Sequence, residues 1–157
     1  MITLAKAGLL QALPEQYPTI LCPQAVFDEI LAGPLEDELR SILPDLPWLQ
    51  CVHLDPPISP LASWHLGRGE SEVIEYARLN LTTIALLDDR AARRAAMAVG
   101  VPVYGTLSII AQWVAKTPTI SLQEAVLKLR KAGLYVNDRT ILLVEALLED
   151  LLKGKRL

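Results

Sequence analysis

The stretch TTIALLDDRAARRA, residues 82–95, decides the fold class of this chain. Its first six residues, 82–87, form an apolar run that predicts a strand buried on both faces. Two adjacent carboxylates, Asp88 and Asp89, end the run, and the basic segment that follows predicts a helix over 89–99. A strand that leads directly into a helix is typical of an α/β sheet, where functional sites lie at the carboxyl ends of strands.

The acidic pair has two interpretations at this stage. Neighbouring carboxylates repel each other, and a divalent cation held by oxygen ligands relieves that repulsion, which favours metal-dependent chemistry on a phosphate-containing substrate. Aspartate is also common at helix N-caps. One aspartate explains a cap, and the second needs another reason. Asp88 and Asp89 therefore stay candidates for either role.

Three more acids are compared with this pair. Glu70 opens a helix predicted over 69–80, and the residues three, four and seven positions later are apolar, so we expect Glu70 on the inward face. The alternative is a first-turn acid that complements the helix dipole. Glu29 borders an apolar helical stripe and taken alone is typical of a surface acid. Glu72 is expected to be a solvated partner.

Arginines on the helix after the acidic pair supply positive charge. Arg90, Arg93 and Arg94 form either a solvated helix face or a set of bidentate phosphate contacts. Thr106 follows a strand predicted over 101–104 and places a hydroxyl at the same sheet edge. Its alternative role, which we favour slightly, is the N-cap of the next helix.

Alternating strands and helices predict a parallel sheet. The expected strands are 19–22, 48–54, 82–87 and 101–104, and the expected helices are 3–13, 23–33, 35–43, 69–80, 89–99, 106–116, 122–132 and a last helix ending near 153 that begins with Asn137 or Asp138 as its cap. The fold class is therefore α/β, a three-layer α/β/α sandwich with a short parallel sheet. We expect one domain over residues 1–157, with C-terminal helices at about 121–153.

Composition excludes several classes of protein. The chain has 157 residues, of which 52% are hydrophobic, and this content argues against disorder. A net charge of −3 argues against a purely electrostatic nucleic-acid binder. The apolar runs are too short to span a bilayer and we see no signal peptide, so we expect a cytoplasmic protein. Cys22 and Cys51 are expected to be buried thiols, and the two histidines lack zinc-site spacing.

Five short motifs carry a resemblance to a known family. They are PQAVFDEI (23–30), LGRGE (66–70), LDDRAAR (87–93), GVPVYGTL (100–107) and LKLRKAGL (127–134). With these motifs in this order over nearly the whole chain, the sequence resembles PIN-domain proteins. The similarity is to the bacterial and archaeal branch of uncharacterised PIN-domain nucleic-acid-binding proteins.

The resemblance implies a site and an activity. PIN domains are Mg²⁺- or Mn²⁺-dependent ribonucleases, many are toxins of toxin–antitoxin pairs, and they are often homodimers. The resemblance would make Glu29 and Glu70 the second and third metal-binding acids and would draw the fourth from Asp88 and Asp89, with Asp89 preferred as the ligand. Thr106 would match a hydroxyl residue often found nearby.

One departure from the family pattern affects both the site and the sheet. The first acid of the family is an Asp on an opening strand that precedes a segment like ITLAKAG, and here that segment stands at residues 2–8. In the family this strand lies in the middle of the sheet, so its absence predicts a missing metal ligand and a gap in the hydrogen bonding. Either the assigned start is too late, or the remaining strands have closed up or borrowed a partner's strand.

Three functional hypotheses follow. The first is a metal-dependent endoribonuclease in which Asp88 is a ligand or a base and Arg90 and Arg93 contact phosphate. The second is an inactive PIN-like module that binds RNA or a partner protein such as an antitoxin. The third, a response-regulator receiver, is disfavoured because no lysine follows the strand at 101–104. The apolar last helix either packs on a second subunit or closes its own core.

Overall fold

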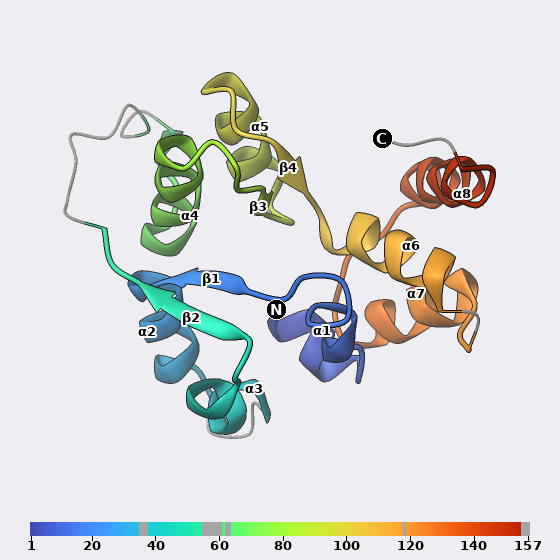
Figure 1. Ribbon diagram of the computed structural model, residues 1–157, viewed down its shortest axis with the longest axis horizontal. Helices are drawn as coiled ribbons and strands as arrows, with labels where there is room; N and C mark the ends of the chain where they lie inside the picture. The colour runs from blue at the N-terminus through green and yellow to red at the C-terminus, as the bar shows by residue number, and fades with distance from the viewer. Residues whose placement is uncertain (35–37, 55–60, 62–63, 118, 155–157) are drawn as a thin grey trace. The chain divides into compact units, whose positions relative to one another are not determined.

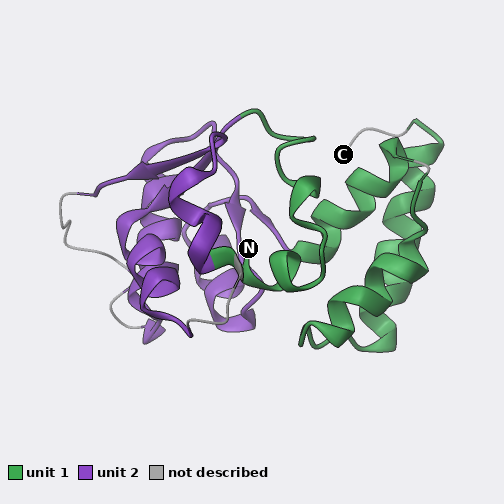
Figure 2. Ribbon diagram, turned by 90° about the horizontal axis from the view of Figure 1, so that it is seen from below, with its two compact units in different colours: residues 1–18, 37–39, 106–157 green, residues 19–36, 40–105 purple. Residues whose placement is uncertain are grey.

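The structure is a computed structural model that describes residues 1–34, 38–54, 61, 64–117 and 119–154. The chain divides into two compact units. Unit 1 comprises residues 1–18, 37–39 and 106–157, and unit 2 comprises residues 19–36 and 40–105 (Figure 2). The expectation of a single domain over 1–157 stays a prediction, and each unit is described in turn.

Unit 2 contains all the strands that the structure describes, and they form two parallel pairs (Figure 1). β1 (Ile20–Pro23) pairs with β2 (Leu49–Val52), and β3 (Ala85–Leu86) pairs with β4 (Val103–Tyr104). The mixed α/β class with parallel strands is therefore confirmed. The single short sheet that the sequence predicted is present as two two-stranded sheets.

The strand predicted over 82–87 is much shorter than expected. β3 spans two residues, and Ile84 directly before it is 47% exposed, so the prediction that this run is buried on both faces is wrong. Among the described strands β3 has a hydrogen-bonded neighbour on one side only, β4. A strand without a second neighbour lacks the packing that would cover its other side.

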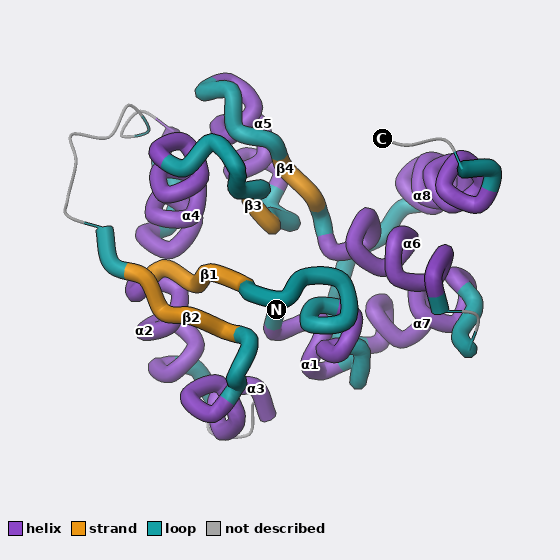
Figure 3. The backbone as a smooth tube through the Cα atoms, in the orientation of Figure 1, coloured by secondary structure: helices purple, strands orange, loops and turns teal. Residues whose placement is uncertain are grey.

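The two pairs have not closed up into one ladder within the described part of the chain. In Figures 1 and 3, β1 and β3 are the inner strands and β2 and β4 the outer ones. The helix α4 (Arg68–Leu79) contacts both β1 and β3 and so connects the two pairs.

The core of unit 2 lies between α4, β3 and the helix α5 (Arg90–Ala98). α5 presents three fully buried alanines to this core, Ala92, Ala95 and Ala96. Alanine favours the helical state and its small side chain allows close packing, so the sequence of α5 explains both its conformation and its proximity to the sheet. The remaining buried members are Leu61, Ile74, Ala77, Ala85, Leu87 and Val101.

The other helices of the chain complete the two units. The helix α2 (Gln24–Ala32) and the 3₁₀ turn η2 (Leu43–Asp45) belong to unit 2, and the short helix α3 (Glu38–Ile42) is divided between the units after Leu39. Unit 1 consists of α1 (Ile2–Lys6), the 3₁₀ turn η1 (Leu10–Ala12), α6 (Thr106–Lys116), α7 (Leu122–Lys131) and α8 (Asp138–Leu152). None of the helices in the described ranges has the length and apolarity needed to cross a membrane.

Local sequence accounts for the helix boundaries in unit 1. The helix predicted over 3–13 is interrupted, because Gly8 adopts φ +64°, a conformation that favours glycine. The Ser121 hydroxyl accepts a hydrogen bond from the Glu124 N–H and caps α7. Of the two cap candidates for α8, Asn137 has this role, since its side chain accepts from Thr140 N–H.

Candidate functional site

Glu29, on α2, accepts a hydrogen bond from the start of another helix. Its Oε1 accepts a hydrogen bond of 3.0 Å from the backbone N–H of Gly69, in the first turn of α4. A Cβ at position 69 would lie 2.6 Å from Glu29 Oε2 and 3.0 Å from Val26 Cγ2. Glycine at 69 therefore allows α2 and α4 to approach closely enough for this bond.

Glu72 makes the converse contact, which the sequence interpretation missed. Its Oε2 accepts a hydrogen bond of 3.0 Å from the N–H of Ala25, in the first turn of α2, and its Oε1 pairs with Arg68 at 3.1 Å. The expectation that Glu72 is merely solvated is wrong. Each of the two helices thus supplies a carboxylate that accepts a hydrogen bond from the other's N-terminal backbone, where the helix dipole favours negative charge.

Glu70 lies at the same end of α4 and is half-buried. Its Oε2 accepts a hydrogen bond of 3.2 Å from the N–H of Gly67, the residue that precedes the helix. The buried acid of α4 is instead Glu75, which is 2% exposed and pairs with Arg78 at 2.5 Å. The expectation of an inward Glu70 therefore needs correction, and the i,i+3 spacing of Glu75 and Arg78 was the available signal for a neutralised buried acid.

The acidic pair divides into two environments. Asp89 is exposed and caps α5, because its Oδ1 accepts hydrogen bonds from Ala91 N–H at 2.7 Å and Ala92 N–H at 2.9 Å. Asp88 precedes the cap, and its Oδ1 lies 3.4 Å from where a Cβ at position 105 would be. Asp89 is therefore the N-cap of α5, and Asp88 lies near the carboxyl end of β4.

Arg93 reaches the same place from α5. Its guanidinium Nη1 lies directly against Gly105, in space that a Cβ at that position would fill. Glycine at 105 therefore lets Arg93 and Asp88 share the carboxyl end of β4. Arg90 and Arg94, by contrast, are exposed on the outer side of α5.

Thr106 lies in the other unit of the chain from the candidate acids. It is the first residue of α6, buried at 1% exposure, and belongs to unit 1, whereas the four acids belong to unit 2. The N-cap role that we favoured is not the observed one, since Thr106 is inside the helix and Gly105 precedes it.

The two cysteines are neighbours across the β1–β2 ladder. Cys22 and Cys51 are register partners, both are free thiols, and only Cys22 is buried, so the expectation of two buried thiols is wrong for Cys51. Burial, with a smaller effect of Cys51, raises the pKa of Cys22 to about 12. Desolvation followed by the charges of Asp28 and Glu72 raises the pKa of Cys51.

The donor chemistry of the candidate site suits a hard cation, but the acids are not gathered around one point. Glu29, Glu70 and Asp89 offer only carboxylate oxygens, the ligands that Mg²⁺ and Mn²⁺ prefer, and in each the second oxygen has no hydrogen bond among the described residues. No three acidic, histidine or cysteine side chains in the described ranges are placed to hold one ion together.

Comparison with known proteins identifies the family. A family model described as the PIN domain matches residues 1–150. The chain belongs to the PIN-domain family. The match covers every acid of the candidate site in this PIN domain, together with Arg93 and Thr106. No curated protein and no solved structure is significantly similar to this PIN-domain chain.

Proposed function

We propose that this PIN-domain protein is a metal-dependent endoribonuclease whose ligands are Glu29, Glu70 and Asp89. Family membership supports the reaction class. The observation that carries the site is the position of two carboxylates at one helix end. Glu29 and Glu70 both accept hydrogen bonds from backbone N–H groups at the start of α4, from Gly69 and Gly67.

In this proposal the chain's own side chains have distinct roles. Glu29, Glu70 and Asp89 would hold Mg²⁺ or Mn²⁺ through their second carboxylate oxygens, and the ion would supply a water molecule of lowered pKa and stabilisation of charge on a phosphate. Asp88 would be a further ligand or a proton acceptor beside them. Arg93, held against Gly105 near Asp88, and Arg90 on the exposed side of α5 contact RNA phosphates.

The proposal requires the acids to draw together when the ion binds. The backbone hydrogen bonds of Glu29 and Glu70 hold one oxygen of each side chain, so the movement needed is a change of side-chain and helix-end positions. Metal binding should therefore stabilise unit 2 against unfolding, because a ligand that binds only the folded state adds its binding free energy to stability.

The test is cleavage of a mixed single-stranded RNA panel by the purified chain in Mn²⁺, Mg²⁺ or EDTA. We expect metal-dependent cleavage that Glu70→Gln abolishes. The matched control is Glu124→Gln, an exposed acid of α7 that pairs with Lys128, and it should cleave as the parent does. Equal cleavage by the parent and Glu70→Gln would contradict the assignment of this ligand.

A second candidate, an RNA-binding module without catalysis, is favoured by a specific observation. Glu29, Glu70 and Asp89 each bond to helix N-terminal backbone, so they have a structural role that needs no metal. Calorimetry separates the two candidates: absence of Mn²⁺ binding at millimolar concentration, with RNA still bound through the arginines of α5, would favour the module. A toxin role with an antitoxin partner stays a prediction of the family resemblance.

A further inference from the structure

The turn between α7 and α8 exposes an aromatic side chain. Tyr135 is 89% exposed, and its side chain has no hydrogen bond or ring contact with the described residues. An aromatic ring in water adds nothing to the core of the protein, whereas at a binding surface the same ring contributes a large contact area. The position of Tyr135 therefore favours a role in binding over a role in packing.

The backbone on both sides of Tyr135 is fixed. Before it, the Leu134 N–H donates a hydrogen bond of 2.9 Å to Leu129 O in α7, and Gly133 adopts the φ of +96° that this kind of helix end requires. After it, the Val136 side chain is buried. The turn thus presents Tyr135 from a defined backbone, which lowers the entropy cost of binding through this residue.

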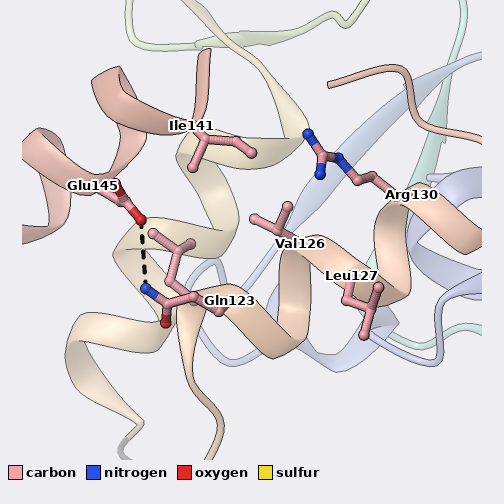
Figure 4. Close-up of a pocket in the computed structure, with 7 residues that line it drawn as sticks. Gln123, Val126, Leu127, Arg130, Ile141 and Glu145 are labelled. Atoms are coloured by element: carbon pink, nitrogen blue, oxygen red, sulfur yellow. Dashed lines mark hydrogen bonds between the residues drawn. The ribbon is translucent and has the colours of Figure 1, made fainter. Parts of the chain in front are cut away.

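Arg130 joins the end of α7 to the start of α8. Its Nη2 donates a hydrogen bond of 2.8 Å to Val136 O and lies 3.6 Å from Asp138 Oδ1. Further along the two helices, Gln123 Nε2 donates to Glu145 Oε1 at 3.4 Å beside a mostly apolar groove of about 310 Å³ (Figure 4). These contacts link α7 to α8 and so hold the turn between them in one shape.

Two exposed cations flank Tyr135. Lys131 ends α7 four residues before it, and Arg139 lies in the first turn of α8 four residues after it. Neither side chain has an ion pair or a hydrogen bond among the described residues. Four residues of chain span at most about 14 Å, so the Cα atom of each cation lies within that distance of the Tyr135 Cα. We call Lys131, Tyr135 and Arg139 the tyrosine turn.

Helix dipoles explain only one of these two cations. Cations stabilise the C-terminal end of a helix, which gives Lys131 a local reason, whereas Arg139 lies at an N-terminal end, where anions are favoured. The segment 128–140 contains four cations and one anion, a net charge of +3, in a chain whose net charge is −3. This local excess, with an arginine that opposes the dipole, favours an anionic ligand.

We propose that the tyrosine turn binds single-stranded RNA, with a base stacked on Tyr135 and phosphates beside Lys131 and Arg139. An aromatic ring that stacks a base and cations that follow the backbone are the two features shared by proteins that bind unpaired strands. Bases in a duplex are already stacked on each other, so the ring selects the unpaired strand. That the strand is RNA rests on the proposed function, while the turn lies in unit 1 and the candidate acids in unit 2.

Fluorescence anisotropy of a short labelled oligoadenylate with the full chain in EDTA tests the proposal. Tyr135→Ala should weaken binding about fivefold or more, the loss of one stacked base, and Tyr135→Phe should bind as the parent does because the ring is kept. Lys131→Gln and Arg139→Gln should each weaken binding and reduce its salt dependence. Lys116→Gln, which removes an exposed cation at the end of α6, is the matched control and should change neither.

Three results would overturn the proposal. They are no binding of oligoadenylate by the parent, equal affinity of the parent and Tyr135→Ala, and an equal loss in Tyr135→Ala and Tyr135→Phe, which would exclude stacking. Circular dichroism of each variant checks that it folds. Cleavage is measured separately: Tyr135-dependent binding without metal-dependent cleavage would keep the tyrosine turn and contradict the proposed function, and cleavage with Tyr135-independent binding would do the reverse.

Discussion

The carboxylate of Glu29 in α2 accepts a hydrogen bond from the backbone of Gly69 in α4, and glycine leaves the space in which that carboxylate lies. The return contact from Glu72 to Ala25 completes a reciprocal arrangement. Two helices far apart in the sequence are thereby fixed at their N-terminal ends. This arrangement holds two of the proposed ligand acids, Glu29 directly and Glu70 as the neighbour of Gly69.

Gly69→Ala should destabilise the protein by about 1–3 kcal/mol, the usual cost of overpacking a close contact. The added Cβ would lie 2.6 Å from Glu29 Oε2 and would separate α2 from α4. Urea unfolding measures the change. Gly67→Ala is the control, because its Cβ would meet nothing nearer than Glu70 Oε2 at 3.7 Å, and equal losses in the two variants would contradict the close-approach argument.

Glu72→Ala should lower the free energy of unfolding by about 1–2 kcal/mol, since a half-buried carboxylate that accepts from helix N-terminal backbone is removed. The same substitution at Glu124, an exposed acid in an i,i+4 pair with Lys128, should cost about 0.5 kcal/mol or less. Thermal or urea unfolding gives both values. A Glu72 variant as stable as the Glu124 variant would show that the bond to Ala25 contributes little.

Asp89 offers a substitution that separates capping from metal binding. Asp89→Asn should keep stability, because asparagine caps helices as well as aspartate, while Asp89→Ala should lose about 1 kcal/mol. If Asp89 is also a ligand, Asp89→Asn should weaken Mn²⁺ binding in calorimetry. Unchanged Mn²⁺ affinity in Asp89→Asn would leave the cap as its demonstrated role and move the ligand assignment to Asp88.

Cys22 should make stability fall at alkaline pH. Its pKa in the folded state is about 12, against a reference value of 9.0, so between these values the unfolded thiol loses its proton and the folded one keeps it. The unfolded state then binds fewer protons, and stability falls with a slope approaching about 1.4 kcal/mol per pH unit. Urea unfolding from pH 8 to 11 should show this slope reduced in Cys22→Ala, and parallel curves would contradict it.

Sequence alone determined the family, the alternating α/β order and most helix positions of this chain. The reason is that these features depend on local signals. The Asp89 cap, the Ser121 cap and the alanines of α5 act within a few residues, and the helix at 106–116 was predicted with its observed ends. The sequence left two roles open for Asp89, and the structure shows the N-cap, which depends only on residues next to it in the chain.

Only the tertiary structure decided which groups the acids face. The bonds from Glu29 to Gly69 and from Glu72 to Ala25 join residues 40 and 47 positions apart, and no periodic pattern encodes such a distance. The length of β3 likewise depended on its neighbours, because an apolar run becomes a buried strand only where other strands pair with it on both sides. The sequence supplied the carboxylates of Glu29 and Glu72, and the packing of α2 against α4 determined which backbone N–H groups they accept hydrogen bonds from.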